Sequence, residues 1–202
     1  MSPLFFSAEA LEQVVFVVID GLDASGKDTQ AMRLRDFLES NGKTVFLRVH
    51  PSSDNLLGAR ARQFLLSKGK SAHFASALFY MFDVVRSILL YSWKKYDYVI
   101  FVRYLMGTAY LPSPLHRFAY VFFVSFVPTS DLMFFLDIKP EEAHSRIQQG
   151  RNRREMFENL KELEKVRCKA LSLALAGKWT IVDASRSAEE VEREIRRECL
   201  GS

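Results

Sequence analysis

The sequence has few of the residues that mark fibrous, disordered or disulfide-rich proteins. Only nine glycines and six prolines occur in 202 residues, too few for a collagen-like or low-complexity chain. The two cysteines, Cys168 and Cys199, stand far apart, without the short spacing of a metal site. We interpret them as thiols in a reducing compartment. These scarcities argue against a disulfide scaffold and against a cysteine-based centre.

Long hydrophobic runs and a strong charge of one sign are also missing. The most apolar stretch, Phe118–Val127, is far shorter than the roughly 20 residues that cross a bilayer. Met1–Gln13 lacks the basic start of a signal peptide. Net charge is +4, from 28 Lys and Arg against 24 Asp and Glu, which suits a polyanionic ligand but gives little support to nucleic-acid binding. We therefore expect a soluble cytoplasmic protein with neither a membrane nor a nucleic acid as partner.

Strand-like and helix-like runs alternate along the chain. Val14–Ile19 is a continuous apolar run rich in β-branched residues, typical of a strand buried on both faces. Further strands are predicted at Thr44–Val49, Tyr98–Val102, Leu132–Ile138 and Trp179–Val182. Helices are predicted at Asp28–Gly42, Leu56–Ser67, His73–Lys95 and Leu115–Val127, from Lys139 onward, and at Glu155–Ala176 and Ala188–Cys199. This order predicts one α/β domain over residues 1–202, a three-layer sandwich whose five-stranded parallel sheet has helices on both faces.

A glycine-rich loop directly follows the first predicted strand. Within Asp20–Thr29 (DGLDASGKDT), Gly21, Gly26 and Lys27 fit the G-x-x-x-x-G-K pattern. In that pattern backbone N–H groups surround phosphate oxygens and the lysine reaches the β- and γ-phosphates of ATP. The next helix adds its positive N-terminal end, and we expect the Lys27 side chain to be exposed. The sequence thus predicts a P-loop NTPase-type fold with a phosphate loop at 21–29, in which the ATP-binding residues are Gly21, Leu22, Asp23, Ala24, Ser25, Gly26, Lys27, Asp28 and Thr29.

The last position of the loop departs from the pattern. Asp28 stands where a Ser or Thr normally places a hydroxyl on Mg²⁺, and Thr29 follows one place later. A carboxylate is a good ligand for a hard cation, so Asp28 is a candidate Mg²⁺ ligand. Alternatively, Asp28 caps the helix and interacts favourably with its dipole. Both interpretations remain open on the sequence alone.

Five segments, in order along nearly the whole chain, resemble the thymidylate kinase family of nucleoside monophosphate kinases. The resemblance implies transfer of the γ-phosphoryl group of ATP to a nucleoside 5′-monophosphate, with Mg²⁺, in a homodimer. The leading acceptor is dTMP, which would give dTDP. The alternatives are a kinase of another nucleotide on the same core and a nucleotide-binding relative without catalysis. The segments are VVIDGLDASGKDTQA (Val17–Ala31), GARARQFLL (Gly58–Leu66), VRYLMGTAY (Val102–Tyr110), DLMFFLDIKPEEAHSRIQQGRNRR (Asp131–Arg154) and WTIVDASRSAEEV (Trp179–Val191).

The resemblance also implies roles for individual residues. Arg103 matches the arginine of the family's DRY segment and should hold the acceptor phosphate, because a planar guanidinium bonds phosphate oxygens in pairs. Arg62 matches a second arginine on the acceptor side. Asp23 matches a residue that faces the acceptor sugar, and Tyr110 lies where the family has an aromatic residue near sugar and base. Lys27 and Arg103 are thereby expected to be catalytic.

A basic segment, Gly150–Arg154, is the expected lid. It lies where the resemblance places the family's mobile lid. Some family members carry a catalytic arginine in the phosphate loop instead, but that position is Ala24 here. The resemblance therefore implies that Arg151, Arg153 or Arg154 supplies the catalytic charge, and spacing does not distinguish among them. A solvated basic turn is the alternative interpretation.

One departure from the family pattern concerns the metal. The aspartate of the DRY segment, which normally helps to organise Mg²⁺, is Val102 in this chain. The carboxylate missing at Val102 and the carboxylate added at Asp28 suggest one hypothesis: the carboxylate has moved from the strand end to the phosphate loop.

A second departure concerns the acceptor base. The family stacks the base on a Phe and reads it with an Arg four residues later. Spacing from Arg103 selects Phe79 and Asp83, although an ionised Asp cannot donate to a carbonyl. The chemistry selects Phe82 and Arg86 instead. Core packing is the third interpretation for both Phe residues.

Two apolar helices that flank the third strand support the homodimer independently. They cover Leu78–Leu90 and Phe118–Val127. The second has apolar residues around nearly its whole circumference, whereas a surface helix of a monomer should show a polar face. A symmetric interface between helices would bury this excess. Its aromatic residues are Phe118, Tyr120, Phe122, Phe123 and Phe126.

Overall fold

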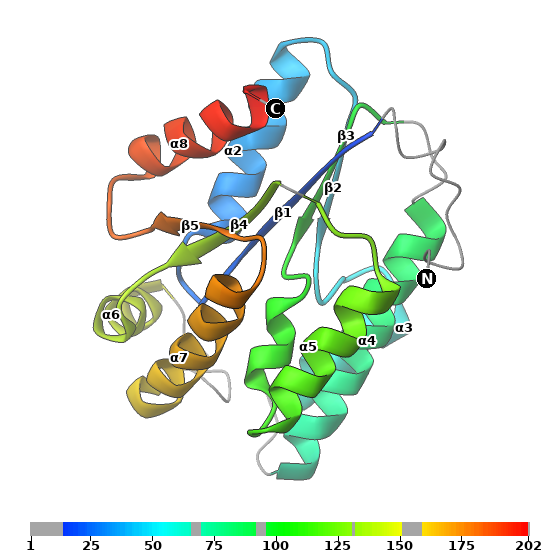
Figure 1. Cartoon of the computed structure of the whole chain (residues 1–202), viewed down its shortest axis with the longest axis vertical. Coiled ribbons are helices and arrows are strands. Elements are labelled where there is room, and N and C mark those ends of the chain that lie inside the picture. Colours follow the sequence, from blue (N-terminus) through cyan, green and yellow to red (C-terminus); the bar gives the residue numbers. More distant parts are fainter. Residues whose placement is uncertain (1–13, 66–69, 92–95, 131, 151–158, 202) are drawn as a thin grey trace.

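The computed structural model describes residues 14–65, 70–91, 96–130, 132–150 and 159–201. Strands and helices alternate along them, as the sequence predicts (Figure 1). The strands are β1 (Val15–Gly21), β2 (Val45–Val49), β3 (Tyr98–Val102), β4 (Leu132–Asp137) and β5 (Thr180–Asp183). The helices are α2 (Lys27–Ser40), α3 (Leu56–Leu65), α4 (Lys70–Tyr91), the 3₁₀ helix η1 (Met106–Tyr110), α5 (Leu115–Phe126), α6 (Pro140–Gly150), α7 (Leu160–Ala176) and α8 (Ala188–Leu200).

The described strands form one parallel sheet in the order β2-β3-β1-β4-β5. Because β1 lies between β3 and β4, it marks the point where the chain changes from one half of the sheet to the other. The register places Ile19 beside Val102 and Gly21 beside Leu136. The three central strands therefore end at the same edge. In open parallel sheets, this edge at this switch point is where ligands bind.

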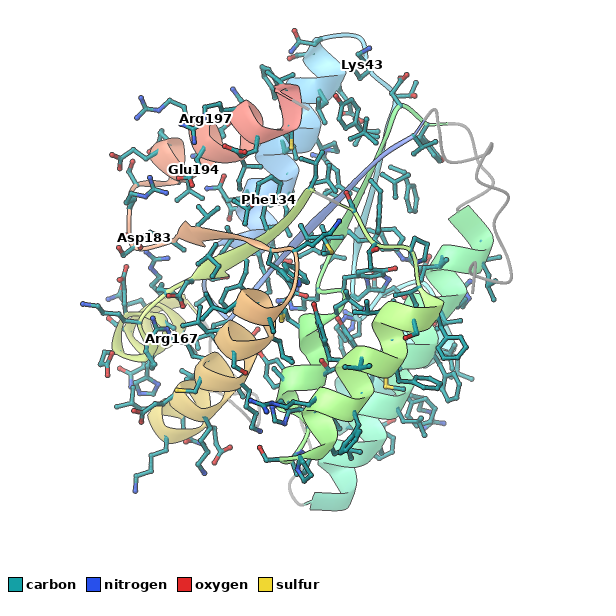
Figure 2. The ribbon with its side chains drawn as sticks, viewed as in Figure 1. Lys43, Phe134, Arg167, Asp183, Glu194 and Arg197 are labelled. Atoms are coloured by element: carbon teal, nitrogen blue, oxygen red, sulfur yellow. The ribbon has the colours of Figure 1, made fainter. Side chains whose placement is uncertain are left out.

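Helices cover both faces of the sheet, which confirms the predicted three-layer sandwich. α2 and α8 lie on one face, and α4, α5 and α7 lie on the other (Figure 1). The central strands are buried between them, with Val17 and Ile19 of β1 fully inaccessible. Figure 2 shows Phe134 of β4 inside the layers and Arg197 on the outer side of α8. Continuous apolar strands are stable only when both faces are covered in this way.

The observed boundaries differ from the predicted ones by a few residues. α4 begins at Lys70 rather than at His73, and β5 ends one residue later than predicted, at Asp183. The sequence did not predict η1, because five residues are too few to show a helical period. The predicted helix start at Glu155 lies outside the described residues.

α5 has two apolar faces, only one of which is buried. His116, Tyr120 and Phe123 face the interior. On the opposite side Phe118 is 69% exposed and Phe126 is 62% exposed. Neither α5 nor any other described helix is both long and apolar enough to span a membrane.

His50, directly after β2, is a buried histidine that the sequence did not single out. Its Nε2 lies 2.9 Å from Ser87 Oγ and its Nδ1 lies 3.4 Å from the Val102 carbonyl oxygen. Burial is the main cause that lowers the pKa of His50 from 6.5 to about 4. In the folded protein the imidazole is therefore neutral at pH values where it would be protonated in the unfolded chain.

This shift predicts acid-induced loss of stability. Between about pH 6.5 and pH 4 the unfolded chain binds a proton that the folded one does not, so the free energy of unfolding falls as pH falls, by up to about 3 kcal/mol. His50→Asn should make that dependence shallower, because it removes the titrating group. Urea unfolding of both proteins across this range measures it. Parallel curves for the two proteins would show that His50 is not the cause.

Candidate active site

The phosphate loop joins the end of β1 to the start of α2. Gly21 has a φ of +154°, and a Cβ there would lie 2.6 Å from the Leu136 carbonyl oxygen, so β4 leaves room only for glycine. Gly26, at the N-cap of α2, has a left-handed φ of 88°. The loop therefore turns tightly into the helix N-terminus, where backbone N–H groups favour an anion. Ser25 Oγ is buried and has no hydrogen-bond partner among the described residues, and a phosphate oxygen would satisfy it.

Lys27 is buried, which corrects the expectation that its side chain is exposed. Only 1% of the residue is accessible. Its Nζ donates to the Leu22 carbonyl oxygen at 2.7 Å and lies 3.5 Å from Asp23 Oδ1. Burial and the charge of Arg103 lower the pKa of Lys27, whereas Asp23 and Asp28 raise it. The loop thus folds around its own lysine and holds the amine beside the phosphate position.

Arg103 lies immediately after β3, with an unusual positive φ of 56°. Its Nη1 donates to Asp28 Oδ1 at 2.9 Å, and its Nη2 donates to Asp28 Oδ2 at 3.2 Å. Nη2 also lies 3.6 Å from Asp23 Oδ1. Burial lowers the pKa of Arg103, but the charges of Asp28 and Asp23 outweigh it and hold that pKa above its ordinary value. The structure thus brings Arg103 to the phosphate loop, 75 residues away in sequence.

Asp20 holds the backbone around this arginine and was not predicted. Its Oδ1 accepts from the Gly21 N–H at 2.9 Å, and its Oδ2 accepts from the N–H groups of Tyr104 and Met106 at 2.8 and 3.1 Å. Burial raises the pKa of Asp20, although these bonds and Lys27 oppose the rise. One carboxylate therefore ties the phosphate loop to the segment that carries Arg103. A charged residue at the end of a buried strand was the available sequence signal.

Asp23 and Tyr110 complete the cluster. Tyr110 Oη donates to Asp23 Oδ2 at 3.1 Å, while Asp23 Oδ1 faces Lys27 and Arg103. Burial raises the pKa of Tyr110 well above its ordinary value, so it donates as a neutral phenol. The structure thereby places five of the predicted site residues together at the carboxyl ends of β1 and β3. They are Asp23, Lys27, Asp28, Arg103 and Tyr110.

Phe79 and Asp83, the pair that spacing selects for the base, lie on α4 and already have partners within the protein. Asp83 is fully buried, and its carboxylate accepts from Ser52 N and Ser52 Oγ at 2.6 Å each and from Asn55 Nδ2 at 2.8 Å. This carboxylate holds the segment after β2. Phe79 stacks on Phe64 with ring centroids 5.6 Å apart. Asp83 is thus committed to the segment after β2, and Phe79 has one face of its ring on Phe64.

The second pair on α4 is more open. Phe82 is 50% exposed. Arg86 Nη1 is buried and has no hydrogen-bond partner in the part of the chain that the structure describes. An unsatisfied guanidinium nitrogen is costly to bury, so a ligand that accepts a hydrogen bond from it would be stabilised. Of the two predicted pairs, Phe82 and Arg86 are therefore the one with an exposed ring and an unused N–H donor.

The structure does not link Arg62 to the cluster, and most of the predicted lid lies outside the described residues. Arg62 is exposed on α3. Gly150 is the last residue of α6, and Arg151, Arg153 and Arg154 lie outside the described residues. Their roles therefore stay predictions.

Arg146, on α6, is a further link to the phosphate loop that the sequence did not single out. Its Nη1 donates to the Ala24 carbonyl oxygen at 3.3 Å, and its Nη2 donates to the Ala184 carbonyl oxygen at 3.2 Å. Glu142 Oε1 accepts from the same Nη2 at 2.6 Å. Arg146 thus joins the phosphate loop to the segment after β5.

An apolar cavity of about 790 Å³ lies at the opposite end of the sheet. Phe16, Val99 and Met133 line it, near the amino ends of β1, β3 and β4. The charged cluster described above does not contribute to it. This apolar cavity is therefore separate from the proposed reaction site, which depends on the charged groups at the carboxyl ends of the strands.

The fold and the cluster define a class. A phosphate loop between the first strand and first helix of a parallel sheet, at its switch point, with a lysine and an arginine beside it, is the arrangement of P-loop nucleotide-binding phosphotransferases. The sequence comparisons narrow this class. The sequence pattern of the family described as thymidylate kinase matches residues 19–195. The chain belongs to the thymidylate kinase family and is thus a phosphotransferase with ATP as phosphate donor.

Individual relatives agree with this assignment. A probable thymidylate kinase of Pyrococcus abyssi is 33% identical over 202 residues, which cover 92% of this chain and 98% of that protein. The thymidylate kinase of Leifsonia xyli is 29% identical, with 90% and 92% covered. The solved structure of thymidylate kinase from Candida albicans has a TM-score of 0.75 at 19% identity and covers 94% of this chain and 92% of its own. This last likeness confirms the fold.

Proposed function

We propose that this chain, acting as one kinase domain over residues 1–202, transfers the γ-phosphoryl group of ATP to dTMP and forms dTDP. The observation that carries the proposal is the convergence of Lys27 and Arg103, the two predicted catalytic cations, on the end of β1. Phosphoryl transfer needs a donor phosphate and an acceptor phosphate held in line and neutralised. A phosphate-loop lysine and a strand-end arginine supply one cation for each.

Each residue of the cluster has a distinct task in this proposal. The loop N–H groups and Ser25 hold the ATP phosphates, and Lys27 neutralises the transferred group. Arg103 donates two N–H groups to the acceptor phosphate. Asp23, held by Tyr110, presents a carboxylate to the acceptor sugar. Lys27 and Arg103 thus supply positive charge on the donor side and the acceptor side of the transfer.

The residues at the end of the loop fit Mg²⁺. Val102, at the position where the family has an aspartate, is fully buried and apolar, so the strand end offers no ligand. Asp28 is a carboxylate on the first turn of α2, 45% of whose side chain is exposed. Mg²⁺ is commonly held by one or two carboxylates together with substrate phosphates and water, and Asp28 would be the carboxylate here. When bound, Mg²⁺ neutralises charge on the β- and γ-phosphates.

The choice of base is the part of the proposal with an alternative. A kinase of another nucleoside monophosphate stays the second candidate, because Asp83 is committed to Ser52 and Asn55. We propose that Phe82 and Arg86 meet the base, since the Arg86 guanidinium has a donor to spare. Arg86→Ala should then raise KM for dTMP more than KM for ATP. The same rise for both nucleotides would contradict this role.

The lid proposal predicts unequal effects of its arginines. Replacement of Arg151, Arg153 and Arg154 by Ala, one at a time, should lower kcat by about 10² or more at the catalytic position. A residue that only attracts nucleotides should instead raise KM, and its effect should weaken with salt. Steady-state kinetics at two ionic strengths measure both. If all three variants kept kcat, the catalytic charge would have to come from outside the lid.

We also propose a cytoplasmic homodimer. Cys168 and Cys199 are both thiols, as a reducing compartment requires. The exposed face of α5 supports the dimer, because isolated folded proteins seldom expose so many large apolar side chains in one place. The large apolar residues that α5 exposes are Leu115, Phe118, Val121, Phe122, Val124 and Phe126.

The dimer proposal predicts a mass of twice the chain by light scattering. Phe122→Glu should give monomers, because a buried unpaired charge is costly at a symmetric interface. Leu200→Glu is the matched control, since Leu200 is similarly exposed on α8, away from this face. A monomeric starting protein, or a dimer that survives Phe122→Glu, would rule out this interface.

A further inference from the structure

The guanidinium fork of Arg103 is already filled by a carboxylate of the same chain. Asp28 presents both oxygens to it, at 2.9 Å from Nη1 and 3.2 Å from Nη2. Bidentate pairing of this kind uses the same two N–H groups, in the same plane, that an arginine offers to a phosphate. Arg103 is also the residue proposed to hold the acceptor phosphate. The Asp28 carboxylate and the acceptor phosphate would therefore compete for the same two N–H groups of Arg103.

We infer that Asp28 is a specificity-determining residue that occupies the place of the acceptor phosphate on Arg103, so that an acceptor binds only by displacing it. The inference rests on the proposed function and deepens it. It predicts that the site selects phosphorylated acceptors, because an uncharged nucleoside has no group that can compete with a carboxylate for the guanidinium.

The two partners are held unequally, which decides which one moves. Arg103 follows β3, and Asp20 fixes the next residue, Tyr104, by accepting its N–H at 2.8 Å. Asp23 Oδ1 lies 3.6 Å from the guanidinium and stays beside it. Asp28 instead has a half-exposed side chain on the first turn of α2, where the helix N-terminus stabilises a free carboxylate. Release of Asp28 is thus the less costly movement.

The position of Asp28 in the loop supports the same inference. The phosphate-loop pattern takes Ser or Thr there, and a hydroxyl carries no negative charge that could compete for Arg103. Once displaced, the Asp28 carboxylate is free to bind the Mg²⁺ that arrives with ATP. Binding of the acceptor and of the metal would then favour one another. The acceptor phosphate takes Arg103 and frees Asp28, and the metal takes Asp28 and frees Arg103.

Equilibrium binding without metal tests the displacement apart from turnover. Metal-free protein is titrated with dTMP and, separately, with inorganic phosphate, using calorimetry. Asp28→Asn should bind both about tenfold more tightly than the unchanged protein, because no carboxylate has to be displaced. Asp36→Asn removes a carboxylate from the same helix, paired with Arg35, and should stay within about twofold of the unchanged protein. Its turnover should also stay unchanged.

A structure of the dTMP complex supplies the second readout. The inference predicts phosphate oxygens on both Arg103 Nη atoms and the Asp28 carboxylate turned away from them. Equal affinities for Asp28→Asn and the unchanged protein, or an intact pair in the complex, would overturn it. If the unchanged protein failed to phosphorylate dTMP, the proposed function would fall, while the titration with inorganic phosphate would still decide the role of Asp28.

Discussion

Lys27→Met should lower kcat by about 10² or more while the protein still folds. The side chain is fully buried in the phosphate loop, and Met has a similar volume, so packing is largely kept. In the proposed function this amine neutralises the transferred phosphoryl group. Loss of a positioned cation from a water-excluded site costs several kcal/mol of transition-state stabilisation.

The control for Lys27→Met is a measurement that the variant is still folded. Circular dichroism and thermal unfolding should show a folded protein, and ADP binding should weaken less than kcat falls, because loop N–H groups still hold the phosphates. A folded variant with near-normal turnover would refute the phosphate-loop assignment. An unfolded variant would move the test to Lys27→Arg, which keeps the charge but misplaces it.

Arg103→Gln should lower kcat/KM for the acceptor by about 10² to 10⁴, because it removes two charge-assisted hydrogen bonds, each worth about 1.5–3 kcal/mol. Arg103→Lys should recover part of this loss, since a lysine keeps the charge without the fork. KM for ATP should change far less in both variants, because Arg103 acts on the acceptor.

Arg35→Gln is the matched control for Arg103→Gln. Arg35 is a partly exposed arginine of α2 that pairs with Asp36, so its substitution removes the same charge away from the cluster. Its kinetics should match those of the unchanged protein. A loss that falls equally on ATP and acceptor in Arg103→Gln would show that Arg103 supports the loop rather than the acceptor phosphate.

The sequence was sufficient for the fold and for the position of the glycine-rich loop within it. β-Branched runs such as Val14–Ile19 predict buried strands from local composition alone. The glycines and lysine of the phosphate loop lie within ten consecutive residues, so their arrangement can be recognised without knowledge of packing. The three-layer sandwich and the loop at the end of β1 are both confirmed.

The sequence was not sufficient for the partners of charged side chains. Asp28 meets Arg103 across 75 residues, and Asp20 meets Tyr104 across 84. Such pairs depend on which strand ends lie side by side, and no local pattern records that. Lys27 was expected to be exposed for the same reason, since its burial depends on how the whole loop closes.

Asp83 shows a related difficulty. A polar residue on an apolar helix invites a ligand-binding interpretation. The structure instead gives its carboxylate three donors from Ser52 and Asn55, which is how buried charges are usually accommodated. These donors lie about 30 residues earlier in the chain, and no local pattern there predicts the contact.

The most direct measurement of the central claim is ATP consumption with a panel of nucleoside monophosphates in the presence of Mg²⁺. The panel contains dTMP, dUMP, dCMP, dAMP and dGMP, with thymidine as the acceptor that lacks a phosphate. We predict that dTMP gives the highest kcat/KM, with dTDP as product, and that thymidine gives none. Turnover with a different monophosphate alone would contradict the choice of base, and nucleotide binding without any turnover would contradict the assignment of this chain as a kinase.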